Sequence, residues 1–286
     1  MSNYVGRFAP SPTGELHAGS LACALATYLD ARAHNGVWII RIENIDPPRE
    51  KPGAIASQLA VLDAFEMYSD REIVYQSERS DLYEASLDKL RKAGRLFGCA
   101  CSRKSIEEEI KRLGLKPGVY PGTCRKGCGD KPVRAWRFLV PDETIGFDDR
   151  LAGHFEQHLT QDVGDFVLKR ADGLWAYQLA VVTDDAAQGI THVVRGADLL
   201  DNTPRQIALQ RALGLPTPVY MHIPLVLGED GKKLSKQNSA VPIDMTHPEE
   251  ALLAAWQHLG FEPFPFDSYG EFYKKATRRW LESLKR

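Results

Sequence analysis

Two loops of this chain carry residues suited to binding phosphate groups. The first, Arg7 to Ser20, reads RFAPSPTGELHAGS; Gly14 and Gly19 allow the backbone to approach a ligand closely, and His17 stands before helix amides that favour negative charge. The second, Gly231 to Gln237, reads GKKLSKQ and supplies three lysines and a serine, which can neutralise charge on a triphosphate in a transition state. Together the loops predict nucleotide chemistry.

Four of the five cysteines lie within thirty residues of one another, and they are Cys99, Cys101, Cys124 and Cys128. Cys23 stands apart, on a helix face that we expect to be buried. Because the amino terminus shows no secretory signal, clustered thiols favour zinc over disulfides. Ligand chemistry alone favours a site made by all four cysteines, since thiolate is a common zinc ligand. Four reduced cysteines without a metal are the alternative.

Strand and helix patterns alternate along most of the chain. The run Val37 to Ile42, VWIIRI, is too continuous in apolar residues for a strand with one wet face, so we expect burial on both faces. Helical spacing is found in residues 18–34, 54–65, 81–92, 177–187 and 203–213, and strand-like runs are YVGRFA, DFVLKR, THVVRG and VYMHIPLVLG. Such alternation predicts an α/β fold with a doubly wound, parallel, Rossmann-like sheet.

The alternation is interrupted by a segment rich in glycine, proline and cysteine. We therefore predict a first half of the catalytic domain in residues 1–98, an insertion with the zinc site in 99–164, a second half in 165–240 and a short helical region in 241–286. The last region shows helical patterns in two pieces, around LLAAWQHLG and YGEFYKKATRRWLESLKR. No internal repeat is evident.

Composition describes an ordinary globular protein of 286 residues, 43% hydrophobic and 26% charged. With 36 basic and 38 acidic residues, the net charge of -2 gives no general attraction to polyanions. Any RNA must therefore bind to local basic patches, such as those in the insertion and the tail. No run of about 18 apolar residues occurs. We expect a cytoplasmic protein without a membrane segment, and no obligatory protein partner is indicated.

The two loops also resemble known signatures. HAGS (His17 to Ser20) and KLSKQ (Lys233 to Gln237) resemble the HIGH and KMSKS motifs of class I aminoacyl-tRNA synthetases. RIENID, GITHVVRGADLL, NTPRQ and HIPLVLGEDGKKLSKQ look like the glutamyl-tRNA synthetase catalytic domain, over residues 4 to about 240. Because fewer than fifty residues follow KLSKQ, the chain most resembles the shortened glutamyl-Q tRNA(Asp) synthetase family. HAGS lacks the second histidine of HIGH, for which Ser20 or a helix amide could substitute.

The resemblance implies a glutamate site, and the residue types agree with it. Glutamate offers one ammonium and two carboxylates, so its site needs a fixed anion, here Glu43, and guanidinium groups, here Arg7 and Arg195. Each of these residues could instead be part of a structural salt bridge. The full glutamate set that the resemblance implies is Arg7, Phe8, Ala9, Pro10, Ser11, Glu43, Tyr177 and Arg195.

The resemblance likewise implies an ATP site and a metal site. The ATP residues are His17, Gly19, Lys233, Ser235 and Lys236, of which His17 and Lys236 are the expected catalytic groups. Mg²⁺ is expected to arrive with the ATP phosphates, because that ion does not need a dedicated protein cage. For one structural Zn, the family pattern implies Cys99, Cys101, Tyr120 and Cys124, with tyrosine in the place that ligand chemistry would give to Cys128.

Members of the glutamyl-Q family activate L-glutamate with ATP and attach it to queuosine in the anticodon loop of tRNA(Asp). The resemblance therefore implies ATP, L-glutamate and queuosine-containing tRNA(Asp) as partners. Two alternatives stay open from the sequence. One is conventional charging of tRNA(Glu). The other is a noncatalytic RNA-binding relative or a nucleotidyltransferase that acts on another acid.

Overall fold

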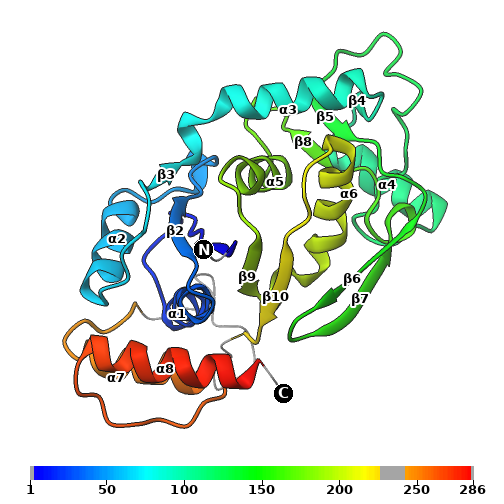
Figure 1. Ribbon diagram of the computed structural model, residues 1–286. Coiled ribbons are helices and arrows are strands. Elements are labelled where there is room, and N and C mark those ends of the chain that lie inside the picture. Colours follow the sequence, from blue (N-terminus) through cyan, green and yellow to red (C-terminus); the bar gives the residue numbers. More distant parts are fainter. Residues whose placement is uncertain (1–2, 226–241, 285–286) are drawn as a thin grey trace.

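Parallel strands form the centre of the protein, which a computed structural model describes over residues 3–225 and 242–284 (Figure 1). These strands are β1 (Val5–Phe8), β2 (Val37–Ile42), β3 (Val74–Tyr75), β9 (His192–Gly196) and β10 (Val219–Ile223). They pair in the orders β1-β2-β3 and β9-β10, all parallel. The N–H of Thr191 donates to the carbonyl of Val5 at 2.9 Å, which sets β9 beside β1. The predicted Rossmann-like arrangement is confirmed, and its ligand crevice is expected at the carboxyl ends of β1 and β9.

Strand β2 shows why the sheet needs helices on both faces. Trp38 and Ile40 belong to one buried cluster, whereas Ile39 belongs to another on the opposite side. Because successive side chains of a strand point to opposite faces, an unbroken apolar run leaves neither face for water. Burial on both faces, predicted from VWIIRI, is confirmed.

Helices cover the two faces at positions close to those predicted. They are α1 (Ala18–Ala33), α2 (Ala54–Ala64), α3 (Ser80–Lys92), α5 (Tyr177–Ala187) and α6 (Thr203–Leu213). Helix α1 contributes to the first cluster, and α3, α5 and α6 contribute to the second, so they lie on opposite sides of the sheet. Short turns of 3-10 helix occupy Pro47–Arg49, Gln76–Glu78 and Ala197–Asn202, and a π-helical turn occupies Leu159–Val163.

The middle of the chain forms two small antiparallel sheets and one helix. These elements are β4 (Leu96–Cys99), α4 (Arg103–Leu113), β5 (Ala135–Phe138), β6 (Thr144–Asp149), β7 (Gly153–His158) and β8 (Val167–Lys169). Strands β4, β5 and β8 pair in that order, and β6 and β7 form a hairpin. The run DFVLKR, expected in the parallel sheet, was therefore wrongly placed: it contains β8, which pairs antiparallel with β5. The domain boundaries proposed from sequence stay predictions.

The C-terminal region contains α7 (Pro248–His258) and α8 (Tyr269–Ser283), as its two helical patterns predict. Both helices pack on α1 at the bottom of Figure 1, where Trp256 and Phe272 enter the same buried cluster as Leu25. The tail thereby covers the outer side of α1.

One buried carboxylate joins distant parts of the chain. Asp30 of α1 has no exposed surface, and it accepts hydrogen bonds from Tyr4 Oη (2.5 Å), Trp280 Nε1 (2.9 Å) and both terminal nitrogens of Arg150 (2.6 and 2.9 Å). Burial alone would raise the pKa of Asp30, but the hydrogen bonds, led by that from Arg150, lower it below its ordinary value. The amino terminus, α1, the β6-β7 hairpin and α8 therefore meet at one charge.

This arrangement predicts a large loss of stability for Asp30→Asn. The substitution leaves the Arg150 guanidinium without its buried partner, which should lower the free energy of unfolding by about 3 kcal/mol. Glu109→Gln is the matched control, because it breaks a solvent-exposed pair with Arg112 and should leave the free energy of unfolding nearly unchanged. Urea denaturation of the three proteins measures both values. Equal stability of the two variants would contradict the role given to Asp30.

Candidate active site

A cavity of about 1340 Å³ opens at the carboxyl ends of the parallel strands. Its walls come from β1 and the loop after it, from the residues after β2, from the start of α5 and from β9. The insertion closes another side through Cys101, Arg103, Arg134 and Arg137. Small-molecule sites usually occupy about 300–1,000 Å³, so this cavity has room for more than one small ligand.

Most of the predicted glutamate residues meet in this cavity. Its lining includes Arg7, Phe8, Ala9, Ser11, Glu43, Tyr177 and Arg195. Pro10 does not line it, but its carbonyl accepts a hydrogen bond from the N–H of Glu43 at 2.9 Å and so ties the first loop to the end of β2. His17 and Gly19 also lie outside the lining. Lys233, Ser235 and Lys236 fall outside the described residues.

Two of the predicted ligand-binding charges are already paired within the protein. Arg7 Nε lies 3.2 Å from Asp185 Oδ1, and Arg41 Nη2 lies 3.1 Å from Glu43 Oε1. Arg41 is fully buried and also contacts Asp185 (2.8 Å) and, more distantly, Asp184 (4.0 Å). A buried charge is tolerated only when it is matched in this way. Structural ion pairs and the candidate site therefore share the same residues.

Burial and the neighbouring arginines have opposite effects on the pKa of Glu43 and of Asp185. Burial raises the pKa of Glu43, against the influence of Arg41 and Arg7. Burial would also raise the pKa of Asp185, but the same two arginines, which contact it directly, hold it below its ordinary value. Tyr177 stands near Glu43, and burial raises the pKa of its hydroxyl, so the phenol is a neutral hydrogen-bonding group in the cavity.

Arg195 differs from Arg7 and Arg41 because its hydrogen bonds go to uncharged groups. Its guanidinium donates to His222 Nε2 (3.0 Å), to Gln206 Oε1 (2.8 Å) and to Thr203 Oγ1 (2.7 Å). None of its direct partners in the described part of the chain is a carboxylate. The residue is only 4% exposed and lines the cavity. It therefore presents a positive charge to a ligand, and a carboxylate would complete it.

His17 occupies the N-cap position of α1. It has extended backbone angles, and its Nδ1 accepts the N–H of Ser20 at 3.3 Å. A neutral imidazole that accepts at Nδ1 carries its proton at Nε2, so Nε2 is a donor suited to a phosphate oxygen. Ser20, considered as a substitute for the second histidine of HIGH, uses its amide to orient His17.

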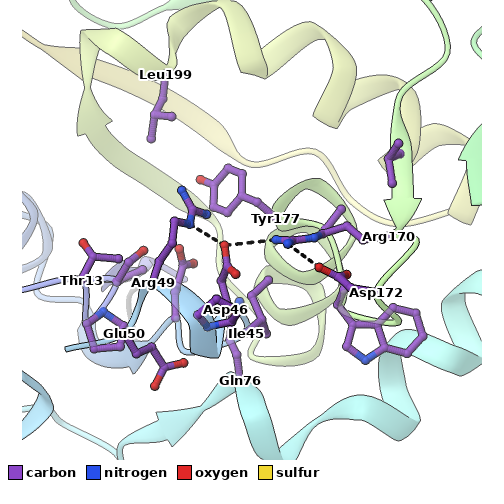
Figure 2. A pocket seen from close by; sticks show the side chains of 18 of the residues that line it. Thr13, Ile45, Asp46, Arg49, Glu50, Gln76, Arg170, Asp172, Tyr177 and Leu199 are labelled. Atoms are coloured by element: carbon purple, nitrogen blue, oxygen red, sulfur yellow. Dashed lines mark hydrogen bonds and ion pairs between the residues drawn. The ribbon is translucent and has the colours of Figure 1, made fainter. Parts of the chain in front are cut away.

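A chain of ion pairs crosses the cavity near its rim (Figure 2). Oδ2 of Asp46 lies between Arg49 Nε (2.5 Å) and Arg170 Nη1 (3.2 Å), and Arg170 continues to Asp172 at 2.6 Å. Oδ1 of Asp46 and Oε1 of Glu50 are buried, and neither has a hydrogen-bond partner within residues 3–225 and 242–284. Burial and the proximity of Asp46 raise the pKa of Glu50. These oxygens can accept hydrogen bonds from a ligand with hydroxyl groups.

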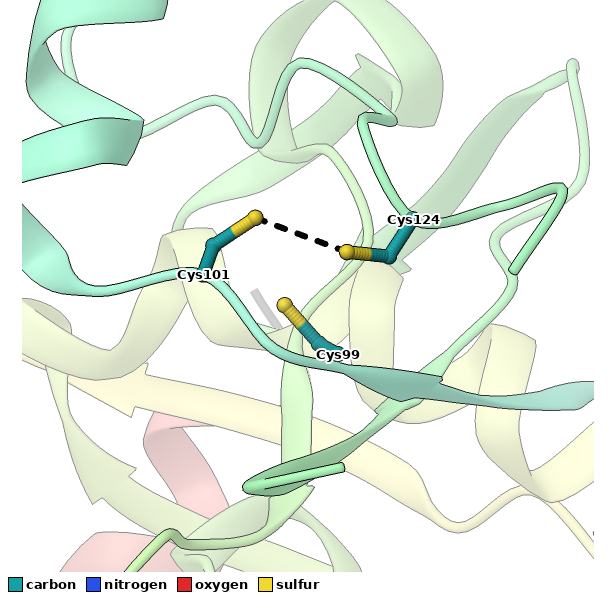
Figure 3. Close-up of side chains that lie close together, drawn as sticks. All are labelled: Cys99, Cys101 and Cys124. Carbon is teal, nitrogen blue, oxygen red and sulfur yellow. Dashed lines mark hydrogen bonds between the residues drawn. The ribbon is translucent and has the colours of Figure 1, made fainter. Parts of the chain in front are cut away.

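Three thiols of the insertion converge on one point (Figure 3). The sulfur atoms of Cys99, Cys101 and Cys124 lie within 4.8 Å of one another. Tyr120 joins them, since its Oη is 3.4 Å from Cys99 Sγ and 3.7 Å from Cys101 Sγ. Cys128 lies beside this cluster: its thiol donates to the carbonyl of Gly98 at 3.3 Å, and its side chain also interacts with Cys124.

The electrostatics of this cluster suit a cation. Burial raises the pKa of Cys101 to about 11 and raises the pKa of Tyr120 still further. Burial also opposes ionisation of Cys124, but hydrogen bonds from Ala100, Tyr120 and its neighbours lower its pKa to about 7. A bound cation would favour the charged form of every one of these groups. Three sulfurs and a phenol oxygen match zinc's usual four ligands in number, and the three thiols match them in type.

Several functional positions were missed in the sequence. Arg41, Asp184 and Asp185 hold the buried ion pairs, and Cys23 packs against the buried cluster of α1, as expected, but also lines the cavity. Charged residues inside apolar runs, such as VWIIRI and the VVTDD stretch, were the available signal. No comparable signal marked Asp46, because a carboxylate in a proline-rich loop is usually solvated.

In the described residues, no helix has the length and apolar character that crossing a membrane requires. This finding agrees with the absence of a long apolar run in the sequence.

Comparison with known proteins gives consistent matches. The family described as tRNA synthetases class I (E and Q), catalytic domain, matches residues 4–267. A glutamyl-Q tRNA(Asp) synthetase of Janthinobacterium sp. (strain Marseille) is 50% identical over 288 residues, which cover 98% of this chain and 97% of the relative. Another from Burkholderia mallei (strain ATCC 23344) is 56% identical over 265 residues, 91% of this chain and 89% of the relative.

Solved structures resemble the same catalytic region. A glutamate tRNA ligase from Elizabethkingia meningosepticum CCUG26117, solved in complex with its amino acid, superposes with a TM-score of 0.74 at 29% identity, covering 84% of this chain and 54% of that one. A glutamate-tRNA synthetase from Elizabethkingia anophelis gives a TM-score of 0.73 at 30% identity, covering 82% and 53%. This chain thus spans about half the length of these two solved relatives.

Proposed function

The chain belongs to the class I tRNA synthetases of the glutamate and glutamine type, and within them to the glutamyl-Q tRNA(Asp) synthetases, and from this premise we propose that it activates L-glutamate with ATP and transfers it to queuosine in tRNA(Asp). The observation that carries the proposal is the cavity at the ends of β1 and β9, in which Arg195 contacts no carboxylate among the described residues while Glu43 supplies an anion. Such a pair suits the ammonium group and one carboxylate of an amino acid, and Arg7 adds positive charge for a second carboxylate.

The charges of the cavity assign roles to its residues. Arg195 binds a carboxylate of glutamate, and Glu43, although paired with Arg41, offers its remaining oxygen to the α-ammonium. Arg7 adds positive charge on the same side, and Tyr177 contributes a neutral hydroxyl. Phe8, Ala9 and Ser11 of the first loop close the pocket around the ligand.

In the first step, a glutamate α-carboxylate oxygen attacks the α-phosphorus of ATP. The bond between that phosphorus and the bridging oxygen toward the β-phosphate breaks, and pyrophosphate leaves with the electron pair. No protein nucleophile is needed, so catalysis rests on positioning and on stabilising the charge that develops. His17 donates from Nε2 to a phosphate oxygen, and Lys236, with Lys233 and Ser235, supplies cationic and polar groups for the phosphates. Mg²⁺ bound to the ATP phosphates offsets part of their charge.

In the second step, a hydroxyl oxygen of the acceptor attacks the carbonyl carbon of the mixed anhydride. An ester forms, AMP departs, and the hydroxyl proton is released. The acceptor is the cyclopentenediol of queuosine, and the cavity volume of about 1340 Å³ supports a site that also receives a nucleoside. The unpartnered oxygens of Asp46 and Glu50 would accept hydrogen bonds from its hydroxyl groups.

We further propose that Cys99, Cys101, Tyr120 and Cys124 hold one structural zinc ion. Cys101 lines the cavity as well as facing the other two thiols. Zinc would supply a fixed tetrahedral junction for the insertion at that wall. Basic residues of the insertion that line the same wall, Arg103 and Arg134, would then be held where they can contact RNA phosphates.

The acceptor is tested with labelled glutamate, ATP and tRNA(Asp) that either carries or lacks queuosine. We expect label only on the tRNA that carries queuosine, and removal of its 3′-terminal adenosine should leave the labelling intact. Glutamate-dependent exchange of pyrophosphate into ATP should occur as well. Labelling of tRNA(Glu) at its 3′ end would instead support conventional charging, and absence of exchange would exclude catalysis of the proposed first step.

The zinc ligands are tested by metal content and chelator resistance of Tyr120→Phe and Cys128→Ser. Tyr120→Phe removes one of the four donors, so its zinc affinity should fall by at least about tenfold, the loss typical of removing even an outer-shell partner. Cys128→Ser should keep one zinc ion per chain, because its thiol bonds to Gly98. Retention by the first variant and loss by the second would reverse the assignment.

A further inference from the structure

The guanidinium of Arg195 is held by a network of buried hydrogen bonds. Nη1 donates to Gln206 Oε1 at 2.8 Å, and Nη2 donates to Thr203 Oγ1 at 2.7 Å. Both acceptors belong to α6. The remaining guanidinium nitrogen, Nε, donates to His222 Nε2 at 3.0 Å. The aromatic ring of Tyr220 lies 5.4 Å from the guanidinium carbon. Thr203 Oγ1 also lies 3.2 Å from His222 Nε2, and its hydroxyl can donate to that nitrogen while it accepts from Arg195. The His222 ring changes Nε2 from an acceptor to a donor when its proton moves between the two ring nitrogens.

The protonation of His222 is set by a carboxylate from the insertion. Nδ1 of His222 lies 2.6 Å from Asp149 Oδ2, and both side chains are fully buried. Asp149 is the last residue of β6, and its other oxygen accepts the backbone N–H groups of Leu151 (3.0 Å), Ala152 (2.8 Å) and His222 (3.1 Å). An ionised carboxylate can only accept, so the proton of the neutral ring must lie on Nδ1, and the lone pair of Nε2 faces Arg195.

The ionisation states agree with this geometry. Burial would raise the pKa of Asp149, but the hydrogen bonds from His222 and the backbone lower it below its ordinary value. Burial lowers the pKa of His222, although Asp149 opposes the shift. Near neutral pH the pair is therefore a carboxylate and a neutral imidazole. The described contacts give it no part in the transfer chemistry itself.

We propose that Asp149 and His222 are positioning residues for glutamate: Asp149 keeps His222 in the tautomer protonated at Nδ1, and Nε2 of His222 then holds the Arg195 guanidinium toward the substrate carboxylate. This inference rests on the proposed function, in which Arg195 binds glutamate. It makes the β6-β7 hairpin of the insertion a support of the amino-acid site. The hairpin is also tied to β10 by the N–H of Arg150, which donates to the carbonyl of Tyr220 at 3.0 Å.

Asp149→Asn reverses the tautomer while preserving shape. The three backbone N–H groups at Oδ1 require an acceptor there, so the amide nitrogen must occupy the place of Oδ2. That nitrogen donates to Nδ1 of His222, which moves the ring proton to Nε2. Nε2–H can then donate to Thr203 Oγ1, which lies 3.2 Å away, but it can no longer accept from Arg195, so the hydrogen bond that orients the guanidinium is lost.

Two substitutions of His222 test the hydrogen bonds of its two ring nitrogens separately. His222→Asn keeps a donor near Nδ1 for Asp149 but offers no acceptor at the place of Nε2. His222→Gln extends an amide oxygen to the place of Nε2 and so can still accept from Arg195. Both variants lose the aromatic ring, so each serves as the packing control for the other.

The experiment measures pyrophosphate exchange as a function of glutamate and of ATP for the full-length protein and the three variants. We expect the KM for glutamate to rise about ten- to a hundredfold in Asp149→Asn and His222→Asn, the loss expected for a hydrogen bond to a charged group. His222→Gln should show a clearly smaller rise. The KM for ATP should stay near that of the unmodified protein. Calorimetric titration with L-glutamate provides the same comparison without catalysis.

Nitrogen chemical shifts of labelled His222 report the tautomer directly. We expect protonation at Nδ1 in the unmodified protein and at Nε2 in Asp149→Asn. Unchanged glutamate KM in Asp149→Asn, equal effects of Asn and Gln at position 222, or parallel changes for glutamate and ATP would each overturn the inference. Failure of the unmodified protein to bind glutamate or to exchange pyrophosphate would overturn the proposed function, and this inference with it. Normal activity of the unmodified protein with insensitive variants would overturn the inference alone.

Discussion

The site depends on the requirement that every charge buried at the strand ends be matched. Arg41 is completely enclosed and is neutralised by Glu43 and Asp185, and Arg7 shares Asp185 with it. Removing one member would leave an uncompensated buried charge, which explains why the group is held as a unit. Arg195 stands outside this balance, since its hydrogen bonds go to neutral groups. Under the proposed function, this guanidinium binds a carboxylate of the substrate.

Segments far apart in sequence are required to place these charges. Asp30 gathers the amino terminus, the β6-β7 hairpin and α8 around α1, the helix that His17 caps. The same hairpin carries Asp149, which contacts His222 beside Arg195. The β6-β7 hairpin therefore contacts both α1 and the histidine beside Arg195, and under the proposed function it supports the amino-acid site. Folding of the tail, the hairpin and the site should be cooperative for this reason.

Periodicity predicted the parallel strands and their helices well, because apolar runs such as VWIIRI leave few alternatives. It failed for DFVLKR, since a short strand pattern does not show which neighbour it pairs with, and β8 joins an antiparallel sheet. Motif resemblance placed Glu43 and Arg195 in one cavity, but not the pairing of Glu43 with Arg41, which depends on contacts between distant segments. Ligand chemistry alone could not predict that Tyr120 lies beside the thiols of Cys99 and Cys101, because that position depends on the fold.

The central claim is that Arg195 provides the unmatched positive charge that binds glutamate. Calorimetric titration of L-glutamate into the protein and into Arg195→Met tests it, with Arg103→Met, an exposed arginine at the insertion side of the cavity, as control. We expect Arg195→Met to weaken binding by about a hundredfold or more, as for truncation of one partner in a buried charge pair, and Arg103→Met to bind as the unmodified protein does. Equal glutamate affinity of Arg195→Met and the unmodified protein would contradict the account.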